Sequence, residues 1–260
     1  MTLWSDDVRV MRSPPRDAVT NMALDESMLR TATDTGATLL RIYSWDRPSV
    51  SFGRNQRCEG SYSAQRCEAM GVPAVRRLTG GRALVHAREL TYCVAAPTAA
   101  ASTLRGGYDA INAVLLDALH RLGVDASVAV PAGRTATPGL APCFESPLGG
   151  ELVVGSRKLV GSAQHRQADA FLQHGSILLD DDQGLLHQLA LVPLPQMPPP
   201  ATLRGCLGDV THDMVADAIT EATRAAAPRG IMIVSDDLMS ATHVLTAASR
   251  YRDPCWTWRR

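Results

Sequence analysis

Hydrophobic and polar residues alternate with two different periods along this chain, which predicts a mixture of helices and strands. Segment 108–122 gives the clearest helical pattern, because Ile111, Leu115 and Leu119 share one face and Gly123 follows as a stop signal. Weaker helical patterns lie at 22–30 (with Asn21 as the expected cap), 61–70, 210–227 and 237–251. Strand-like runs lie at 39–45, 49–52, 72–77, 151–164 and 170–179, and the first two are expected to form a hairpin.

A second hairpin pattern surrounds Lys158, where two apolar runs flank a Gly-Ser turn and the lysine opens the second strand. The two-residue period of a strand places Lys158, Val160 and Ser162 on one face. Gly161 lies between Val160 and Ser162 in the sequence, Ala163 follows Ser162, and neither has a large side chain. A substrate could therefore lie close to the backbone there.

The proline-rich segment 192–200 cannot hold regular structure, because proline lacks the N–H group that helices and sheets require. We predict that this segment is an extended clasp at the end of a main domain over 1–200. Residues 201–260 are predicted to form a small helical extension. No internal repeat suggests a solenoid or a propeller.

The composition indicates a folded, neutral protein. With 260 residues, 45% hydrophobic and 20% charged, the chain can bury a sizeable core. Its formal net charge is zero, so we expect neither nucleic acid nor membrane as a partner. The N-terminus lacks a basic segment with an apolar core, and no apolar run approaches the roughly 18 residues that cross a bilayer, which predicts a cytoplasmic location.

The six cysteines include no Cys-x-x-Cys pair. This spacing argues against a zinc site and against a disulfide framework. We therefore expect no bound metal and free thiols, which suit the cytosol.

Lys158 is the only lysine of the chain, since the other 25 of the 26 basic residues are arginines. An arginine keeps its proton at any usable pH, whereas a lysine amine can give up and recover one when burial lowers its pKa. Lys158 is therefore a candidate for proton transfer. A coding bias toward arginine with one chance survivor is the alternative.

Cys143 lies between two prolines in a stretch without helical or strand period, which predicts an ordered loop. A thiol reacts as its thiolate, and a nearby ammonium such as that of Lys158 would favour this form. Cys143 is therefore a candidate nucleophile. A lone cysteine is, however, more often a small buried hydrophobic residue.

Gly80 and Gly81 lie between two apolar runs and would let the backbone approach a ligand. The neighbouring Arg76, Arg77 and Arg82 could bind an anion or shape the rim of a pocket. A Gly-Gly pair is, however, more often an ordinary hairpin turn, and the P-loop pattern is absent. 

The region from Arg54 to Arg88 holds seven arginines against two glutamates. An acidic protein partner docking beside a pocket would explain this local excess of positive charge. A solvated face, with arginine in place of lysine, is the alternative.

Four motifs follow one another in a fixed order. They are RRLTGGRALVH with ELTY over 76–92, CFESP over 143–147, RKLVGSAQ over 157–164 and LQHGSIL over 172–178. In these motifs the chain resembles the biotin/lipoate protein ligase and lipoyltransferase superfamily, and within it the octanoyltransferases of the LipM type. The similarity extends from 21–25 to 251–258.

The resemblance implies an α/β (α+β) fold in which a mixed, mostly antiparallel sheet and flanking helices surround an acyl pocket. It also implies that Cys143 takes an octanoyl group from acyl carrier protein as a thioester, with Lys158 lowering the pKa of the thiol. A lysine of a lipoyl-domain protein, such as the glycine cleavage H protein, then takes the group as an amide. Neither ATP nor another cofactor is needed, and we expect a monomer.

The same motifs assign residues to the acyl substrate. The expected substrate-binding residues are Arg77, Gly80, Gly81, Arg82, His86, Gly161, Ser162, Ala163, His174 and Gly175. Backbone amides near Gly161–Ala163 are candidates to hold the oxyanion. His86 and His174 could instead be hydrogen-bonded core histidines.

Three alternatives stay open. An ATP-dependent lipoate ligase shares the fold, but ligases usually carry a third glycine where Arg82 stands and do not need Cys143. The second alternative is an amidotransferase that moves octanoyl between lipoyl domains, and the sequence distinguishes it poorly from a transferase that uses acyl carrier protein. A noncatalytic acyl-domain binding protein is the third alternative, and the presence of both Cys143 and Lys158 argues against it.

Overall fold

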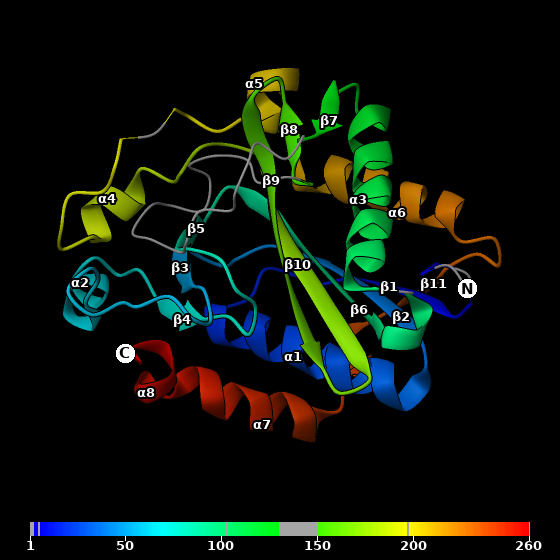
Figure 1. Ribbon diagram of the computed structural model, residues 1–260, viewed down its shortest axis with the longest axis horizontal. Helices are drawn as coiled ribbons and strands as arrows, with labels where there is room; N and C mark the ends of the chain where they lie inside the picture. The colour runs from blue at the N-terminus through cyan, green and yellow to red at the C-terminus, as the bar shows by residue number, and fades with distance from the viewer. Residues whose placement is uncertain (1–2, 5, 102, 130–149, 197, 260) are drawn as a thin grey trace.

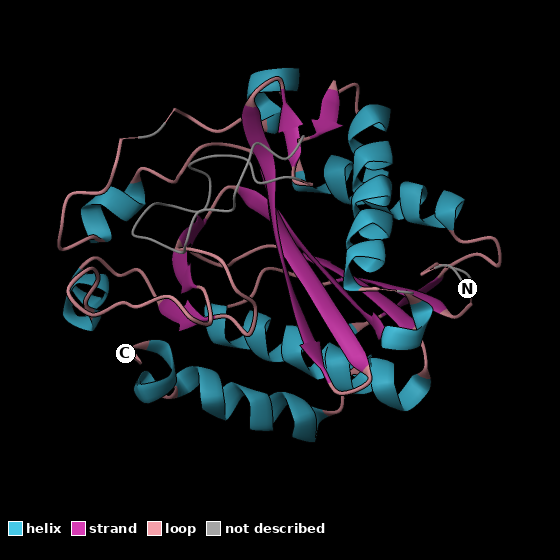
Figure 2. Ribbon diagram, viewed as in Figure 1, coloured by secondary structure: helices cyan, strands magenta, loops and turns pink. Residues whose placement is uncertain are grey.

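The computed structural model describes residues 3–4, 6–101, 103–129, 150–196 and 198–259. An eight-stranded sheet forms its centre, in the order β11-β1-β2-β6-β10-β9-β8-β7 (Figures 1 and 2). Its strands, in chain order, are β1 Val8–Arg12, β2 Thr38–Tyr43, β6 Glu89–Pro97, β7 Ala126–Val128, β8 Leu152–Val154, β9 Arg157–Gln167, β10 Ala170–Leu178 and β11 Met232–Val234. Only β1 pairs in parallel, with β2 and β11, so the sheet is mixed and mostly antiparallel, as expected.

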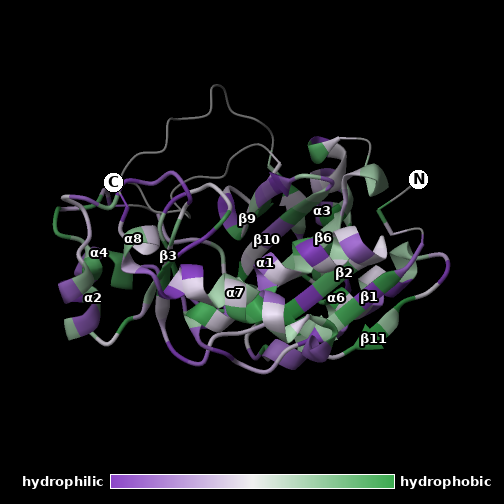
Figure 3. Cartoon of the chain, turned by 90° about the horizontal axis from the view of Figure 1, so that it is seen from below, coloured by the Kyte–Doolittle hydropathy of each residue, from purple (hydrophilic) through white to green (hydrophobic). Residues whose placement is uncertain are grey.

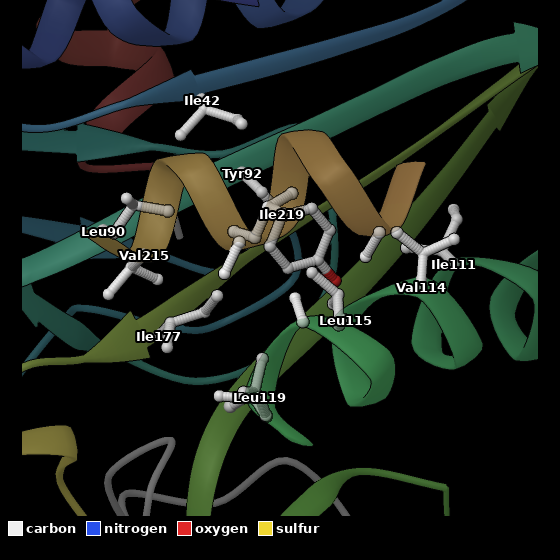
Figure 4. Close-up of a cluster of buried hydrophobic side chains, with 14 of the residues drawn as sticks. Ile42, Leu90, Tyr92, Ile111, Val114, Leu115, Leu119, Ile177, Val215 and Ile219 are labelled. Atoms are coloured by element: carbon white, nitrogen blue, oxygen red, sulfur yellow. The ribbon is translucent and has the colours of Figure 1, made fainter. Parts of the chain in front are cut away.

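Helices cover both faces of this sheet. On one face α1 (Ala18–Thr35) packs against α7 (Ala241–Arg252), and on the other α3 (Leu104–Arg121) packs against α6 (His212–Ala226). Figure 4 shows apolar side chains from α3 and α6 meeting those of β6 and β10. In Figure 3, α7 carries both hydrophilic and hydrophobic residues, as expected of a helix with one face toward a core.

A second sheet of three strands has the order β4-β3-β5. Its strands are β3 Ser49–Phe52, β4 Ala74–Arg76 and β5 Leu84–His86, and the short helices beside it are α2 Ala64–Ala69 and α4 Leu185–Leu189. The predicted hairpin of 39–45 with 49–52 is therefore wrong. β2 pairs with β1 and β6 in the large sheet, whereas β3 pairs with β4 and β5 in the small one.

The first long helix begins earlier than the sequence predicts. Asp17 caps α1, accepting a hydrogen bond from the Thr20 backbone N–H at 3.0 Å. Asn21 is buried inside the helix instead, and its side chain donates to the carbonyl groups of Arg16 and Ser44. A side chain that can cap a helix can equally tie the helix to its neighbours, and the sequence does not separate these roles.

Residues 201–260 hold four α-helices, one short 3-10 helix (Asp236–Leu238) and one strand in the described part of the chain. The helices are α5 Leu203–Leu207, α6, α7 and α8 Pro254–Thr257, and the strand is β11. The described residues of 192–200 form neither helix nor strand, as the prolines predict. The boundary at residue 200 stays a prediction. No helix in the described ranges has the length and apolarity needed to cross a bilayer.

Candidate active site

A cavity of about 330 Å³ lies between the middle of β9 and β10, the loop 78–82 and the end of β2. The structure brings Lys158 and all ten expected substrate-binding residues together on its wall. The remaining lining residues are Met22, Tyr43, Trp45, Leu84, Thr91, Glu151, Gln164 and Ser176. Cys143, the expected nucleophile, lies outside the described residues.

Lys158 and Glu151 form a buried ion pair on this wall. Lys158 Nζ and Glu151 Oε1 lie 2.7 Å apart, and the side chains are 2% and 5% exposed. The predicted hairpin explains the meeting, because β8 and β9 pair around a turn in which Gly155 adopts φ +59°. Glu151 was missed by the sequence reasoning. One signal in the sequence could have found it. Glu151 directly precedes the first apolar run of the predicted hairpin, and Lys158 opens the second run.

Farther along β9, Ser162 contacts Tyr92 of β6, with 2.7 Å between their hydroxyl oxygens. Burial raises the pKa of the Tyr92 phenol, which therefore stays protonated. Gly175 of β10 is opposite Ser162, and a Cβ atom there would lie 2.5 Å from the Gly161 carbonyl oxygen. Only glycine fits at this position, which keeps the cavity open beside β9.

The edge of β9 changes at Val160, where pairing with β8 ends. From Gly161 onward, β9 pairs with β10 on one edge, and no described strand lies on the other. In a strand, successive backbone N–H groups point to alternate edges. Some backbone N–H groups of segment 161–163 therefore point toward the edge of β9 that has no partner among the described strands, as an oxyanion site would require.

His174 is held in place from both ring nitrogens. Its Nδ1 lies 2.9 Å from Asp25 Oδ2, and its Nε2 lies 2.7 Å from Thr79 Oγ1. Asp25 in turn accepts hydrogen bonds from Tyr43 and Arg41, at 2.8 and 3.1 Å. His174 is thus both a hydrogen-bonded buried histidine and a wall residue of the cavity.

His86 is held in a similar way. Its Nδ1 lies 2.7 Å from Glu89 Oε1, and its Nε2 lies 2.6 Å from Ser51 Oγ. Its ring stacks on Trp45 with 3.9 Å between centroids. Burial lowers the pKa of His86 although Glu89 acts in the opposite direction. The neutral ring then donates to Glu89 from Nδ1 and accepts from Ser51 at Nε2.

Arg77 shapes the loop that carries Gly80 and Gly81. Its guanidinium donates to the carbonyl oxygens of Gly80 and Arg82, at 3.1 and 3.0 Å, and to Ser51 Oγ at 2.6 Å. Gly81 has φ +98°, a conformation that favours glycine. Of the two roles that the sequence left open for Arg77, these contacts favour shaping the rim.

Arg76 points away from the cavity and is fully buried. Its guanidinium donates to the carbonyl oxygens of Gly53, Gln56 and Thr257, at 2.6, 2.7 and 3.0 Å. Arg76 therefore joins α8 to the loop that follows β3. These contacts are structural and assign no anion to Arg76.

Comparison with known proteins connects this site to one family. Residues 17–224 match the profile of the lipoyl protein ligase A/B catalytic domain. The chain is 40% identical to octanoyltransferase LipM of Carboxydothermus hydrogenoformans over 166 residues, or 62% of this chain and 61% of that enzyme. It is 39% identical to octanoyltransferase LipM of Kyrpidia tusciae over 193 residues, or 71% of this chain and 70% of that enzyme.

The fold agrees with this relationship. Protein Ta0514 of T. acidophilum, solved with bound lipoic acid, superposes with a TM-score of 0.77 over 97% of this chain and 99% of that chain. The sequences are 19% identical, so the likeness concerns the fold. Because the profile covers most of the chain and the curated relatives share about two fifths of its aligned residues, the chain belongs to the lipoyl protein ligase A/B catalytic domain family.

Proposed function

We propose that this protein is an octanoyltransferase that moves an octanoyl group from acyl carrier protein to a lysine of a lipoyl-domain protein, through a thioester on Cys143. The observation that carries the proposal is the buried Lys158–Glu151 pair on the wall of the cavity. Met22, Trp45 and Leu84 give the same cavity an apolar part. A volume of about 330 Å³ suits a small acyl group.

In the first half-reaction the thiolate of Cys143 attacks the thioester carbonyl of the donor. A sulfur–carbon bond forms, and the negative charge moves to the carbonyl oxygen, where amides of segment 161–163 are candidates to bind it. The bond to the donor sulfur then breaks, and the ammonium of Lys158 donates a proton to this sulfur. The products are acyl-Cys143 and a free carrier thiol.

In the second half-reaction the amine of the acceptor lysine attacks acyl-Cys143. Neutral Lys158 accepts the surplus proton of this nitrogen, and the Cys143 thiolate leaves as the amide forms. The carboxylate of Glu151 stabilises the positive charge that Lys158 carries before the first half-reaction and regains in the second. The cycle returns both residues to their starting state, and no ATP is consumed.

The acceptor follows from the family, since lipoyl protein ligases act on lipoyl-domain proteins. The carrier-protein donor distinguishes this proposal from the ligase and the amidotransferase. The similarity to LipM octanoyltransferases supports the carrier-protein donor.

Intact mass spectrometry tests the proposal. The protein is mixed with octanoylated acyl carrier protein without nucleotide, and we expect one octanoyl adduct on the wild type and none on Cys143→Ala. Cys206→Ala, which removes an exposed thiol, is the matched control and should keep the adduct. Absence of an adduct together with acylation of the acceptor by free octanoate and ATP would contradict the proposal in favour of a ligase.

A further inference from the structure

Arg54 and Arg259 lie side by side near the cavity, and no salt bridge to a carboxylate of the described residues balances either of them. The Arg259 guanidinium donates a hydrogen bond to the Arg54 carbonyl oxygen and stacks over the Trp256 ring, 4.4 Å from its centroid. Arg54 Nη1 lies 3.3 Å from His165 Nδ1. Among the described residues, neither arginine forms an ion pair with an acid.

Arg76 adds a third guanidinium to this group, and we call Arg54, Arg76 and Arg259 the arginine cluster. The Arg76 guanidinium donates hydrogen bonds to the backbone carbonyl oxygens of Arg54 and Arg259, at 3.4 and 3.5 Å. Burial and then the charges of Arg76 and Arg54 lower the pKa of Arg259. Several arginines elsewhere in the structure pair with acids, as Arg88 does with Asp182 at 2.8 Å.

The cluster lies beside the cavity. The Arg54 backbone N–H donates to the Thr79 carbonyl at 2.8 Å, and Thr79 precedes the two glycines of the cavity wall. His165 directly follows Gln164, another wall residue, on β9. Lys158 lies seven positions earlier on the same strand, which corresponds to about 23 Å of extended chain. Figure 1 shows α8, which precedes Arg259, beside β4.

Clustered guanidiniums without acids favour a ligand with concentrated negative charge and several acceptor oxygens, which describes a phosphate. Burial first, and then the charge of Arg54, lowers the pKa of His165. Its neutral ring can accept from Arg54 at Nδ1, and Nε2 then carries the proton and can donate to an anion.

We infer that Arg54 and Arg259, with His165, bind the phosphate of a phosphopantetheine arm. This inference rests on the proposed function, because such an arm carries the octanoyl thioester of a carrier protein. The arm extends from this phosphate toward Lys158 along β9. Arg54, Arg259 and His165 thereby fix one end of the donor, while the acyl group enters the cavity at the other.

Steady-state kinetics with two small donors tests this site. Octanoyl-pantetheine and octanoyl-phosphopantetheine carry the same thioester, and only the second carries a phosphate. We expect the wild type to prefer the phosphorylated donor by about tenfold or more in kcat/KM, mostly through KM. Arg54→Gln and Arg259→Gln should lose this preference and keep their turnover of octanoyl-pantetheine. Arg57→Gln, which alters an exposed arginine of the same segment, is the matched control and should keep the preference.

Three results would overturn the inference. The first is an unchanged preference in both variants. The second is a defect seen only with the intact carrier protein, which would assign the arginines to the acidic surface of that protein. The third is an equal loss with both small donors. Failure of the wild type to use either small donor or the intact carrier protein would instead refute the proposed function.

Discussion

Glu151 and Lys158 face each other across the β8–β9 hairpin, with 2.7 Å between Oε1 and Nζ and almost no exposure of either side chain. Two opposite charges at this distance stabilise each other, and each would be costly to bury alone. The pair therefore ties the chemistry of the only lysine to the stability of the hairpin. Both consequences can be measured.

Lys158→Arg should fold normally and lose octanoyl transfer by about 100-fold or more, because the charge remains while proton exchange does not. Thermal unfolding should show a near-normal Tm, and single-turnover transfer from octanoyl carrier protein should show the loss. Near-normal transfer by this variant would remove Lys158 from the mechanism.

Glu151→Gln should destabilise the protein by about 3 kcal/mol, because it leaves the buried ammonium without this carboxylate. Urea unfolding at neutral pH measures the change. The double variant Glu151→Gln/Lys158→Met should regain part of the loss, since it removes the buried ammonium as well. If the double variant is less stable than Glu151→Gln, the ion pair is not the source of the effect.

Gly175→Ala should lower both stability and activity, because the added methyl group would lie 2.5 Å from the Gly161 carbonyl oxygen and 2.7 Å from Tyr92. Overpacking of this kind costs about 1–3 kcal/mol. We expect a lower Tm and a lower kcat/KM for the octanoyl donor. Gly184→Ala is the matched control, since no atom lies within 4 Å of its added methyl group. Equal effects in the two variants would contradict this explanation.

His86 should make the protein less stable in mild acid. Its pKa in the folded state is lowered by burial, so between the ordinary value of 6.5 and the lower folded value the unfolded chain binds more protons. Stability is therefore complete above about pH 6.5 and falls as the pH decreases through this window. His86→Gln should show a shallower decline in urea unfolding free energy between pH 7 and pH 5. An identical slope in the variant would show that His86 does not contribute.

Local patterns predicted the parts of the site that lie close together in sequence. The Lys158 hairpin forms as its apolar runs and Gly-Ser turn indicate, and α3 follows the predicted helical spacing. The ten residues assigned by motif to the acyl substrate all reach the cavity wall, although their roles stay predictions.

Contacts between distant segments could not be predicted in this way. Asp25 and His174 are separated by 149 positions, and nothing in either local pattern indicates that they meet. The predicted pairing of β2 with β3 was also wrong, because a strand pattern in the sequence indicates burial and does not identify the partner strand. Trp45, which follows β2, lines the cavity and was not predicted to do so.

The bonds of Arg76 have a consequence for synthesis on the ribosome. Its partners at Trp256 and Thr257 are made 180 residues or more after Arg76 itself. At about 5–20 residues per second, roughly 10–35 s pass before the guanidinium can meet them. The loop that follows β3 should therefore reach its final shape only after α8 has been synthesised.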